Sequence, residues 1–315
     1  MLQRRSLQAL PVIVGVSVLT FLLLNLLPGS IALAIAGPGA DPQTIKAIEV
    51  QDGLSKPLWD RYWQWLWHAM QGNLGRSLTS SESVTSLVAH ALPVTLEVII
   101  IAQVVALVLA VPAALAALAD RSGRTDRLLG AVAFAGVSAP HFLWGIILIL
   151  VFSVHFHLLP ATGWVPLTHS VGSNLKSAVL PATTLGIGEF SFYMRILRGD
   201  LIDQLREEYV TTARAKGLSG SRVLVGHVLR NSLFSLITVV GVNFGKLISG
   251  AVIVETLFAL PGLGNLLVTS IYQRDVNVVQ GVVVLTAVAF VIINLAVDLL
   301  YSTIDPRVRY AVANG

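Results

Sequence analysis

Residues 207–218 of the chain read EEYVTTARAKGL, a polar segment inside an otherwise apolar sequence. Its acidic residues come first and its basic residues last, which complements the partial charges at the two ends of a helix. Gly217 lies where a left-handed helix cap is expected, and Ser219 and Ser221 are candidate N-caps of a second short helix. The segment therefore predicts a helix, a tight turn and a helix. The small side chains of Ala213 and Ala215 would let the first helix lie against another protein; a solvated loop is the alternative.

The composition places the chain in a membrane. Of its 315 residues, 55% are hydrophobic and 12% are charged, whereas about 25% charged residues are typical of soluble domains. The net charge of +4 would suit a nucleic-acid-binding protein, but the basic residues flank apolar segments instead of forming one patch. The sequence has no cysteine, which excludes disulfides, thiolate nucleophiles and cysteine metal sites.

Six apolar segments are long enough to cross a bilayer, which takes about 17–25 helical residues. We therefore expect an all-α integral membrane protein with six transmembrane helices. The first segment also has features of a secretory signal, but the further spans favour an uncleaved helix. The predicted spans are 10–27, 89–119, 128–156, 178–197, 233–258 and 279–301.

Basic residues are divided unequally between the two sides of this predicted bundle. Fourteen lie at the termini and around the connections after the second and fourth spans, and six lie in the other connections. By the positive-inside rule, both termini and the loop 199–230 are cytoplasmic. We expect three regions: 1–28 with the first span, an extracytoplasmic region 29–88, and a five-helix core 89–315.

The extracytoplasmic region contains one amphipathic segment. Trp59, Tyr62, Trp63 and Leu66 recur at helical spacing and predict a helix with an aromatic face. Such a helix is typical of the membrane interface, where Trp and Tyr are favoured. The alternative is a platform for an external binding protein.

The sequence contains no phosphate-binding loop. The nearest match, GVNFGKL at 241–247, has one residue too few between its glycines and lacks the Ser or Thr that would bind magnesium. We therefore expect no catalytic residue and no cofactor bound by this chain. Gly241, Gly245 and Ser249 instead form a small-xxx-small ridge, which is typical of closely packed membrane helices.

Two charged residues lie deep in predicted spans, Glu189 and Lys246. A charge at the bilayer centre costs about 2.5–3.5 kcal/mol on insertion scales, so each needs a partner or a wet cavity. Either they pair with one another, or they line a substrate path together with Asn243. His155, His157 and His169 lie near one another in sequence, but no carboxylate accompanies them and we expect no metal site.

The polar segment carries a family resemblance. Tyr209, then TARAKGL at 212–218, then LRN at 229–231 resemble the coupling loop of ATP-binding cassette (ABC) importer permeases of the dipeptide, oligopeptide and nickel family. The similarity extends over nearly the whole chain and includes GAVIVETLF at 250–258. Two residues depart from the pattern: Thr212 replaces the Glu of the wider class, and Ser235 replaces a Pro of related peptide permeases. Further similar residues are LPGLG at 260–264, Arg274, Asp275, Gln280, Gly281, Asn294, Asp298, Tyr301 and DPR at 305–307.

The resemblance implies a type I ABC importer permease fold in a bacterial inner (plasma) membrane, with an extracytoplasmic insertion between spans 1 and 2. It implies a homologous second permease, two cytoplasmic ATPase subunits that bind ATP and Mg, an extracytoplasmic binding protein, a peptide substrate and surrounding lipid, but no nucleic acid. A nickel or metal-chelate importer and an ion-coupled secondary transporter are the alternatives. The residues implied in ATPase coupling are Tyr209, Thr212, Ala213, Arg214, Ala215, Lys216, Gly217 and Leu218.

Overall fold

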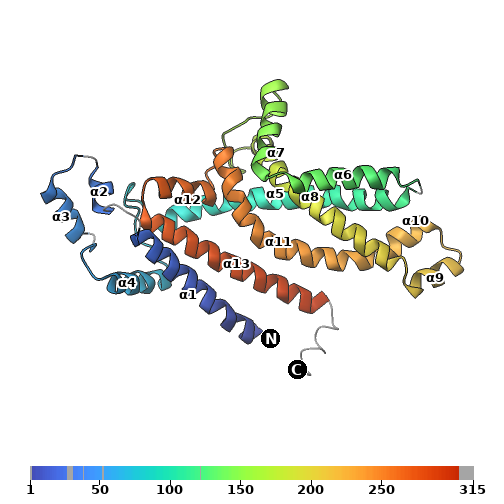
Figure 1. The fold of residues 1–315 in the computed structure, drawn as a ribbon, viewed down its shortest axis with the longest axis horizontal. Coiled ribbons are helices and arrows are strands. Elements are labelled where there is room, and N and C mark those ends of the chain that lie inside the picture. The colour runs from blue at the N-terminus through green and yellow to red at the C-terminus, as the bar shows by residue number, and fades with distance from the viewer. Residues whose placement is uncertain (1, 27–30, 38, 52, 121, 305–315) are drawn as a thin grey trace. The chain divides into compact units, whose positions relative to one another are not determined.

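The structure is a computed structural model, and it describes residues 2–26, 31–37, 39–51, 53–120 and 122–304 (Figure 1). Within these ranges the regular structure is helical, apart from one isolated bridge between Arg76 and Ser83. The chain divides into two compact units, Met1–Thr95 with Pro261–Leu295 and Leu96–Leu260 with Ala296–Gly315. These units cut across the three regions predicted from the sequence.

The first unit has its own apolar core. Leu74, Val84, Val88, Leu263 and Val278 are buried against one another there. Residues of this unit belong to α1 (Leu2–Leu26), α2 (Ile31–Ala36), α3 (Pro42–Gln51), α4 (Leu58–Met70), the start of α5 (Val84–Ala119), α12 (Leu263–Tyr272) and most of α13 (Val276–Ile304).

A buried carboxylate fastens the loop before α5 to the start of α13. Asp275 is 1% exposed, and its Oδ2 accepts hydrogen bonds from the hydroxyls of Ser77 (2.5 Å) and Thr79 (3.2 Å). Its Oδ1 accepts the backbone N–H of Val278 at 3.3 Å, inside the first turn of α13. Asn277 adds a bond from Nδ2 to the carbonyl of Arg76 at 2.8 Å. One carboxylate thus caps a helix and orders a loop about 200 residues away in sequence.

The second unit is organised around α8 (Val171–Gln204), which packs against α6, α7 and α11. A Cβ on Gly186 of α8 would lie 3.1 Å from the carbonyl oxygen of Ala102, so α5 and α8 approach closely where a side chain is missing. The other elements of this unit are α6 (Arg124–Ser138), α7 (His141–Leu148), the π-helix η1 (Ile149–His155), α9 (Glu208–Ala215), α10 (Gly220–Val223), the π-helix η2 (Leu224–Val228) and α11 (Leu229–Leu257).

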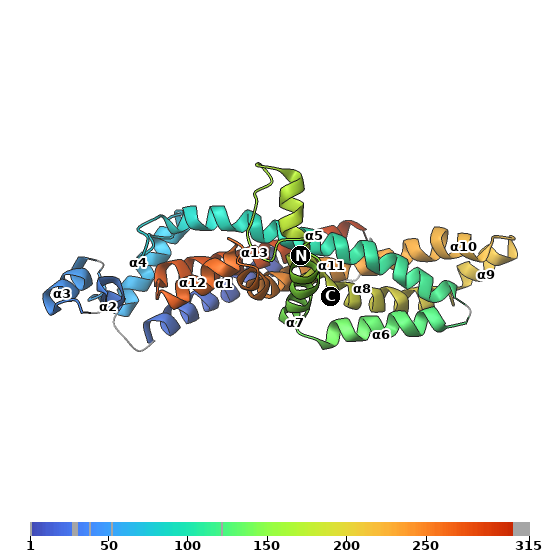
Figure 2. The same ribbon diagram turned by 90° about the horizontal axis from the view of Figure 1, so that it is seen from above.

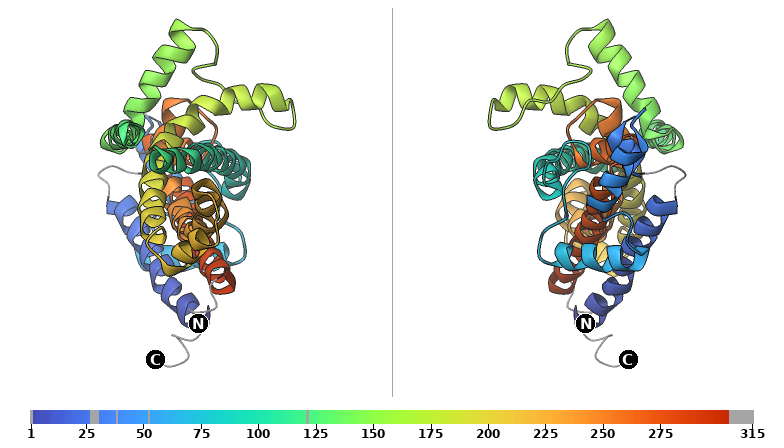
Figure 3. Two further views of the ribbon diagram at one scale, coloured as in Figure 1. Left: turned by 90° about the vertical axis from the view of Figure 1, so that its right-hand side faces the viewer. Right: turned by 90° about the vertical axis from the view of Figure 1, so that its left-hand side faces the viewer.

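The predicted third span, 128–156, is two helices and not one. The pair α6 and α7–η1 is bent by 107° (Figure 3). Ala139 is extended, with ψ 137°, because the residue before a proline avoids the helical region, and Pro140 then precedes α7. Trp144 donates from Nε1 to the carbonyl of Gly136 across the bend at 3.3 Å.

Three helices of the described residues are long and apolar enough to cross a membrane, or four if the bent pair is one span. The predicted second span falls within the first of these, Val84–Ala119, and the predicted fifth and sixth spans overlap the other two, Gly220–Leu257 and Val276–Val297. The apolar part of α1 is shorter, Leu10–Leu26, and α8, which contains the predicted fourth span, carries many polar residues. The all-helical membrane fold is confirmed.

Candidate functional site: the α9 helix and a buried polar cluster

The segment around α9 has the predicted helix, turn and helix. Gly217 follows α9 with φ +81°, the left-handed conformation that glycine adopts readily. The backbone N–H of Gly217 donates to the carbonyl of Arg214 (2.9 Å), and that of Leu218 donates to Ala213 (3.3 Å). Ser219 occupies the N-cap position of α10, as predicted, but its side chain makes no capping hydrogen bond. The other candidate, Ser221, lies inside α10, so that part of the prediction is wrong.

The inner face of α9 is part of the second unit's core. Val210 is 1% exposed and Ala213 is 8% exposed, and both belong to the buried cluster that includes Val228 and Leu236. Residues three apart on a helix share one face, so Val210 and Ala213 face the core together. This corrects the expectation that Ala213 lies against another protein: its small side chain permits packing inside the chain.

Tyr209 fixes α9 to the end of α8. Its side chain is half-buried, and its hydroxyl donates to Oε1 of Gln204 at 2.7 Å. Figures 1 and 2 show α9 and α10 at one end of the second unit, beyond the C-terminal end of α8 and the N-terminal end of α11. A displacement of α9 would therefore act directly on these two long helices.

The outer face of α9 is polar and exposed. Glu208 lies near its start and Arg214 and Lys216 near its end, and none of them takes part in an ion pair within the described residues. Ala215 and Gly217 are exposed between these charges, and a Cβ on Gly217 would meet nothing within 4 Å. Thr212 is exposed as well, with its hydroxyl donating to the carbonyl of Glu208. This face has small side chains and charges of both signs.

A polar cluster crosses three helices of the second unit. Asn243 of α11, 6% exposed, donates from Nδ2 to Oε2 of Glu189 on α8 at 3.0 Å. The fully buried Tyr193 donates to Oε1 of Gln103 on α5 at 2.7 Å. Gln103 in turn donates from Nε2 to the carbonyl of Val240 at 3.4 Å. Glu189 and Tyr193 are one turn apart on α8, so the two pairs are neighbours.

Glu189 and Lys246 do not pair. Within the described residues they form no ion pair, and Lys246 is exposed where Asn243 is buried. The partner of Glu189 is Asn243, which corrects the pairing alternative drawn from depth alone. Gln103 and Tyr193 were missed, although Gln103 is the only polar side chain in residues 98–119, a signal that the sequence offered.

Part of the small-residue ridge of α11, Gly241, Gly245 and Ser249, packs against other helices of the same chain. A Cβ on Gly241 would lie 2.6 Å from a methyl group of Val297, so α11 and α13 are in close contact there. Gly245 is buried, whereas Ser249 is exposed. The histidines at 155, 157 and 169 belong to no group of three metal-binding side chains in the part of the chain that is described.

The aromatic helix α4 turns its tyrosine inward. Tyr62 is 5% exposed, shares a 2.8 Å hydrogen bond with the Ser17 hydroxyl and packs edge-on against Phe21 of α1. Trp59 and Trp63 are 63% and 50% exposed. The predicted aromatic face is therefore divided: Tyr62 holds α4 to α1, and the tryptophans remain available outside.

Two family models together cover most of the chain. The model described as "Binding-protein-dependent transport system inner membrane component" matches residues 105–310, and that for the N-terminal part of such components matches residues 1–99. A putative peptide transport system permease of Brucella abortus (strain 2308) is 40% identical over 307 residues, 98% of each chain. A glutathione transport system permease of Escherichia coli (strain K12) is 39% identical over 307 residues, also 98% of each.

Proposed function

Since the chain belongs to the inner membrane components of binding-protein-dependent transport systems, we propose that it forms half of the path by which an ATP-driven importer carries peptides. It is a transporter subunit and not itself an ATPase. Relatives at 40% and 39% identity are a putative peptide permease and a glutathione permease. Because glutathione is itself a short peptide, both relatives support a peptide substrate.

The observation that carries the proposal is the two-sided character of α9. Its inner face, Val210 and Ala213, is buried in the second unit, and burying a side chain the size of Val210 stabilises by about 1.5–3 kcal/mol. Its outer face is charged and exposed. When a partner subunit bound to the exposed face moves such a helix, the buried face keeps the helix attached to the second unit, so the movement is passed on to that unit. We propose that ATP binding by partner subunits moves α9, and that α8 and α11 tilt with it.

Six spans are part of this proposal. Besides the three long apolar helices, α1, the bent α6–α7–η1 pair and α8 would each cross the membrane, with both termini and the α9 region cytoplasmic. The fourteen-to-six division of basic residues supports this orientation. The polar residues of α8 are then tolerated because much of that helix is buried within the chain.

The path itself would lie beside the α8–α11 cluster. Lys246 is exposed on this chain, and a lysine left in lipid would cost about 2.5–3.5 kcal/mol, so water or another subunit must cover it. We propose that Lys246 faces the path, with the Glu189–Asn243 pair behind it. The exposed Ser249, one turn further along α11, would contact the second permease.

Cysteine cross-linking tests the proposed docking because the chain contains no cysteine of its own. A single Thr212→Cys variant should cross-link to a cysteine placed on the ATPase surface in the assembled complex, with a yield that changes on ATP addition. Lys46→Cys, on the predicted opposite side, is the matched control and should remain uncross-linked. Uptake by the same complex should stop on ATP depletion and survive collapse of the ion gradient. Cross-linking from Lys46→Cys and none from Thr212→Cys would refute the proposal.

A further inference from the structure

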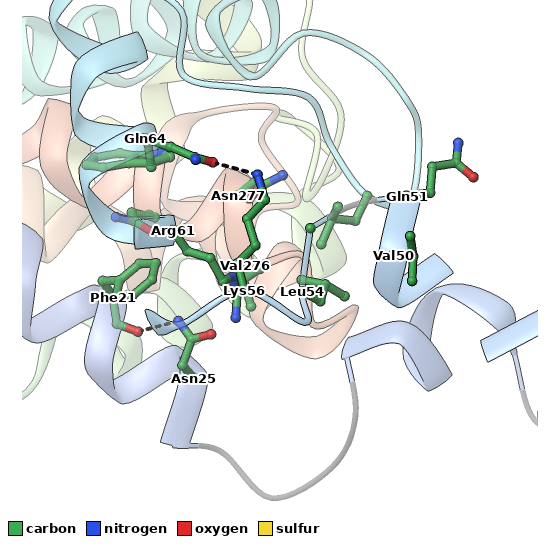
Figure 4. A pocket seen from close by; sticks show the side chains of 14 residues that line it. Phe21, Asn25, Val50, Gln51, Leu54, Lys56, Arg61, Gln64, Val276 and Asn277 are labelled. Carbon is green, nitrogen blue, oxygen red and sulfur yellow. Dashed lines mark hydrogen bonds between the residues drawn. The ribbon is translucent and has the colours of Figure 1, made fainter. Parts of the chain in front are cut away.

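A pocket of about 350 Å³ lies within the first unit, and its function is not explained by coupling or by the proposed path. Figure 4 shows its side chains gathered from α1, from the end of α3 and the segment that follows it, from α4 and from the start of α13. Asn25 near the end of α1 and Asn277 at the start of α13 both line it. In the predicted topology these two helix ends are extracytoplasmic, so the pocket faces the side from which a substrate arrives.

The pocket is cationic. Lys56 and Arg61 line it, and no Asp or Glu is present among the described residues of its wall. The Arg61 guanidinium lies 5.9 Å from the ring centre of Phe21 and makes no side-chain hydrogen bond or ion pair within the described residues. Burial lowers the pKa of Arg61, yet an arginine stays protonated at neutral pH. A partly desolvated positive charge is therefore left without a counter-charge.

Unused hydrogen-bond donors surround the same space. Gln280 lines the pocket, is only 4% exposed, and its Nε2 has no hydrogen-bond partner in the described structure. Nε1 of Trp65, another lining residue, is also buried and has no hydrogen-bond partner among the described residues. A buried donor without an acceptor has given up its hydrogen bond to water and gained none in return. Both groups can only donate, so the ligand that satisfies them must present acceptor atoms.

Gln64 and Asn277 already form hydrogen bonds within the protein. Oε1 of Gln64 accepts from Lys56 Nζ at 3.3 Å, which holds the ammonium beside α4 (Figure 4). Nδ2 of Asn277 donates to the carbonyl of Arg76. The groups that remain for a ligand are thus the guanidinium of Arg61, the remaining donors of Lys56, and the two unpartnered N–H groups.

From this arrangement we infer that the pocket binds the carboxylate of a small ligand. A guanidinium presents two parallel N–H groups that match the two oxygens of a carboxylate. The volume is at the lower end of the range of about 300–1,000 Å³ that small-molecule sites occupy, which suits one end of a peptide and not an entire long chain. The identification of that carboxylate as a peptide C-terminus rests on the proposed function.

The test uses the permease–ATPase complex in nanodiscs of phosphatidylcholine, without ATP and without the binding protein. Saturable binding of radiolabelled trialanine is compared with that of trialanine amide. The acid should bind at least tenfold more tightly. Arg61→Gln should weaken binding of the acid at least tenfold, Arg61→Lys should retain part of it, and Gln280→Leu should weaken it severalfold. Lys46→Gln removes an exposed extracytoplasmic charge outside the pocket and should bind as the wild type does.

Several results would overturn the inference. They are equal affinity for acid and amide, an unchanged affinity in Arg61→Gln, or no saturable binding by the wild type. Displacement of trialanine by nanodiscs of phosphatidylglycerol, with no preference for the acid, would assign the pocket to a lipid phosphate instead. Unfolding midpoints of the variants confirm that each is folded. A complex that binds the acid through Arg61 but never imports peptide would refute the proposed function and leave the pocket standing.

Discussion

The outer face of α9 and the pocket of the first unit both present charged side chains, but in different surroundings. On α9, Glu208, Arg214 and Lys216 are exposed above an apolar face that is buried in the chain. In the pocket, Arg61 is partly buried and burial lowers its pKa. An exposed ion pair is worth roughly 0–1 kcal/mol, whereas enclosed charges interact more strongly. The α9 face therefore suits a contact that is repeatedly made and released, and the pocket suits an anion that is held.

The largest expected effect concerns Asp275, which precedes the pocket residues Val276 and Asn277 in the chain. Asp275→Asn replaces a carboxylate that accepts four hydrogen bonds, from the hydroxyls of Ser77 and Thr79 and the backbone N–H groups of Thr79 and Val278, with an amide that has a single acceptor oxygen. The amide NH2 then faces either the donors at Oδ2 or the N–H of Val278, so at least one of these hydrogen bonds is lost. A hydrogen bond to a charged group is worth about 1.5–3 kcal/mol, and the variant should lose that much stability. The unfolding midpoint of the purified chain measures it.

Glu82→Gln is the matched control for that substitution. Glu82 lies in the same loop but its side chain is exposed, so its loss should change stability by no more than about 0.5 kcal/mol. Equal effects of the two substitutions would show that the Asp275 clasp does not order the loop. Asp275 could then no longer serve as the paired charge with which the unpaired Arg61 is compared.

The next effect tests the two faces of α9 against one another. Ala213→Leu inserts three carbon atoms into a site that is 8% exposed, and such overpacking costs about 1–3 kcal/mol. It should displace α9 and abolish uptake while the protein still inserts. Ala215→Leu adds the same atoms on the exposed face and should leave stability unchanged. Uptake assays and unfolding midpoints of both variants distinguish an inward-facing from an outward-facing Ala213.

Local signals in the sequence predicted what depends on neighbouring residues. The acidic start and basic end of residues 207–218, together with Gly217, predicted α9 and its left-handed turn, because caps and turns involve residues close in the chain. The bend before Pro140 had such a signal too, and it was missed because the apolar composition of 128–156 was given more weight. The long apolar helices followed from composition alone.

Contacts between distant residues could not be predicted in the same way. Depth in the membrane suggested that Glu189 meets Lys246, but depth says nothing about the direction in which a helix face points, and Asn243 is the partner. Arg61 and Gln280 are more than 200 residues apart, and only the fold brings both to one pocket. The sequence alone does not distinguish an arginine that is partly buried without a partner in the described structure, such as Arg61, from one that is exposed to water.

The smallest effect concerns the carboxylate of Asp120, which has hydrogen-bond partners where Arg61 has none among the described residues. Asp120 accepts hydrogen bonds from the backbone N–H groups of Ser122 (2.8 Å) and Thr125 (2.9 Å) and from the Ser122 hydroxyl, and these bonds hold its pKa well below the ordinary value. Since the folded pKa lies below the unfolded value of about 3.9, Asp120 adds stability above that pH. The contribution is lost as pH falls through the folded pKa.

Asp120→Asn should therefore lower the unfolding midpoint at neutral pH, and the difference from the wild type should shrink as pH falls below about 4. Asp203→Asn is the control, because Asp203 is exposed and its side chain makes no hydrogen bond within the described residues. A gap between Asp120→Asn and the wild type that stays constant down to low pH would mean that the charge is not what stabilises this turn. The hydrogen-bond partners of Asp120 would then not be stabilising its charge, and Asp120 would not differ from Arg61 in that respect.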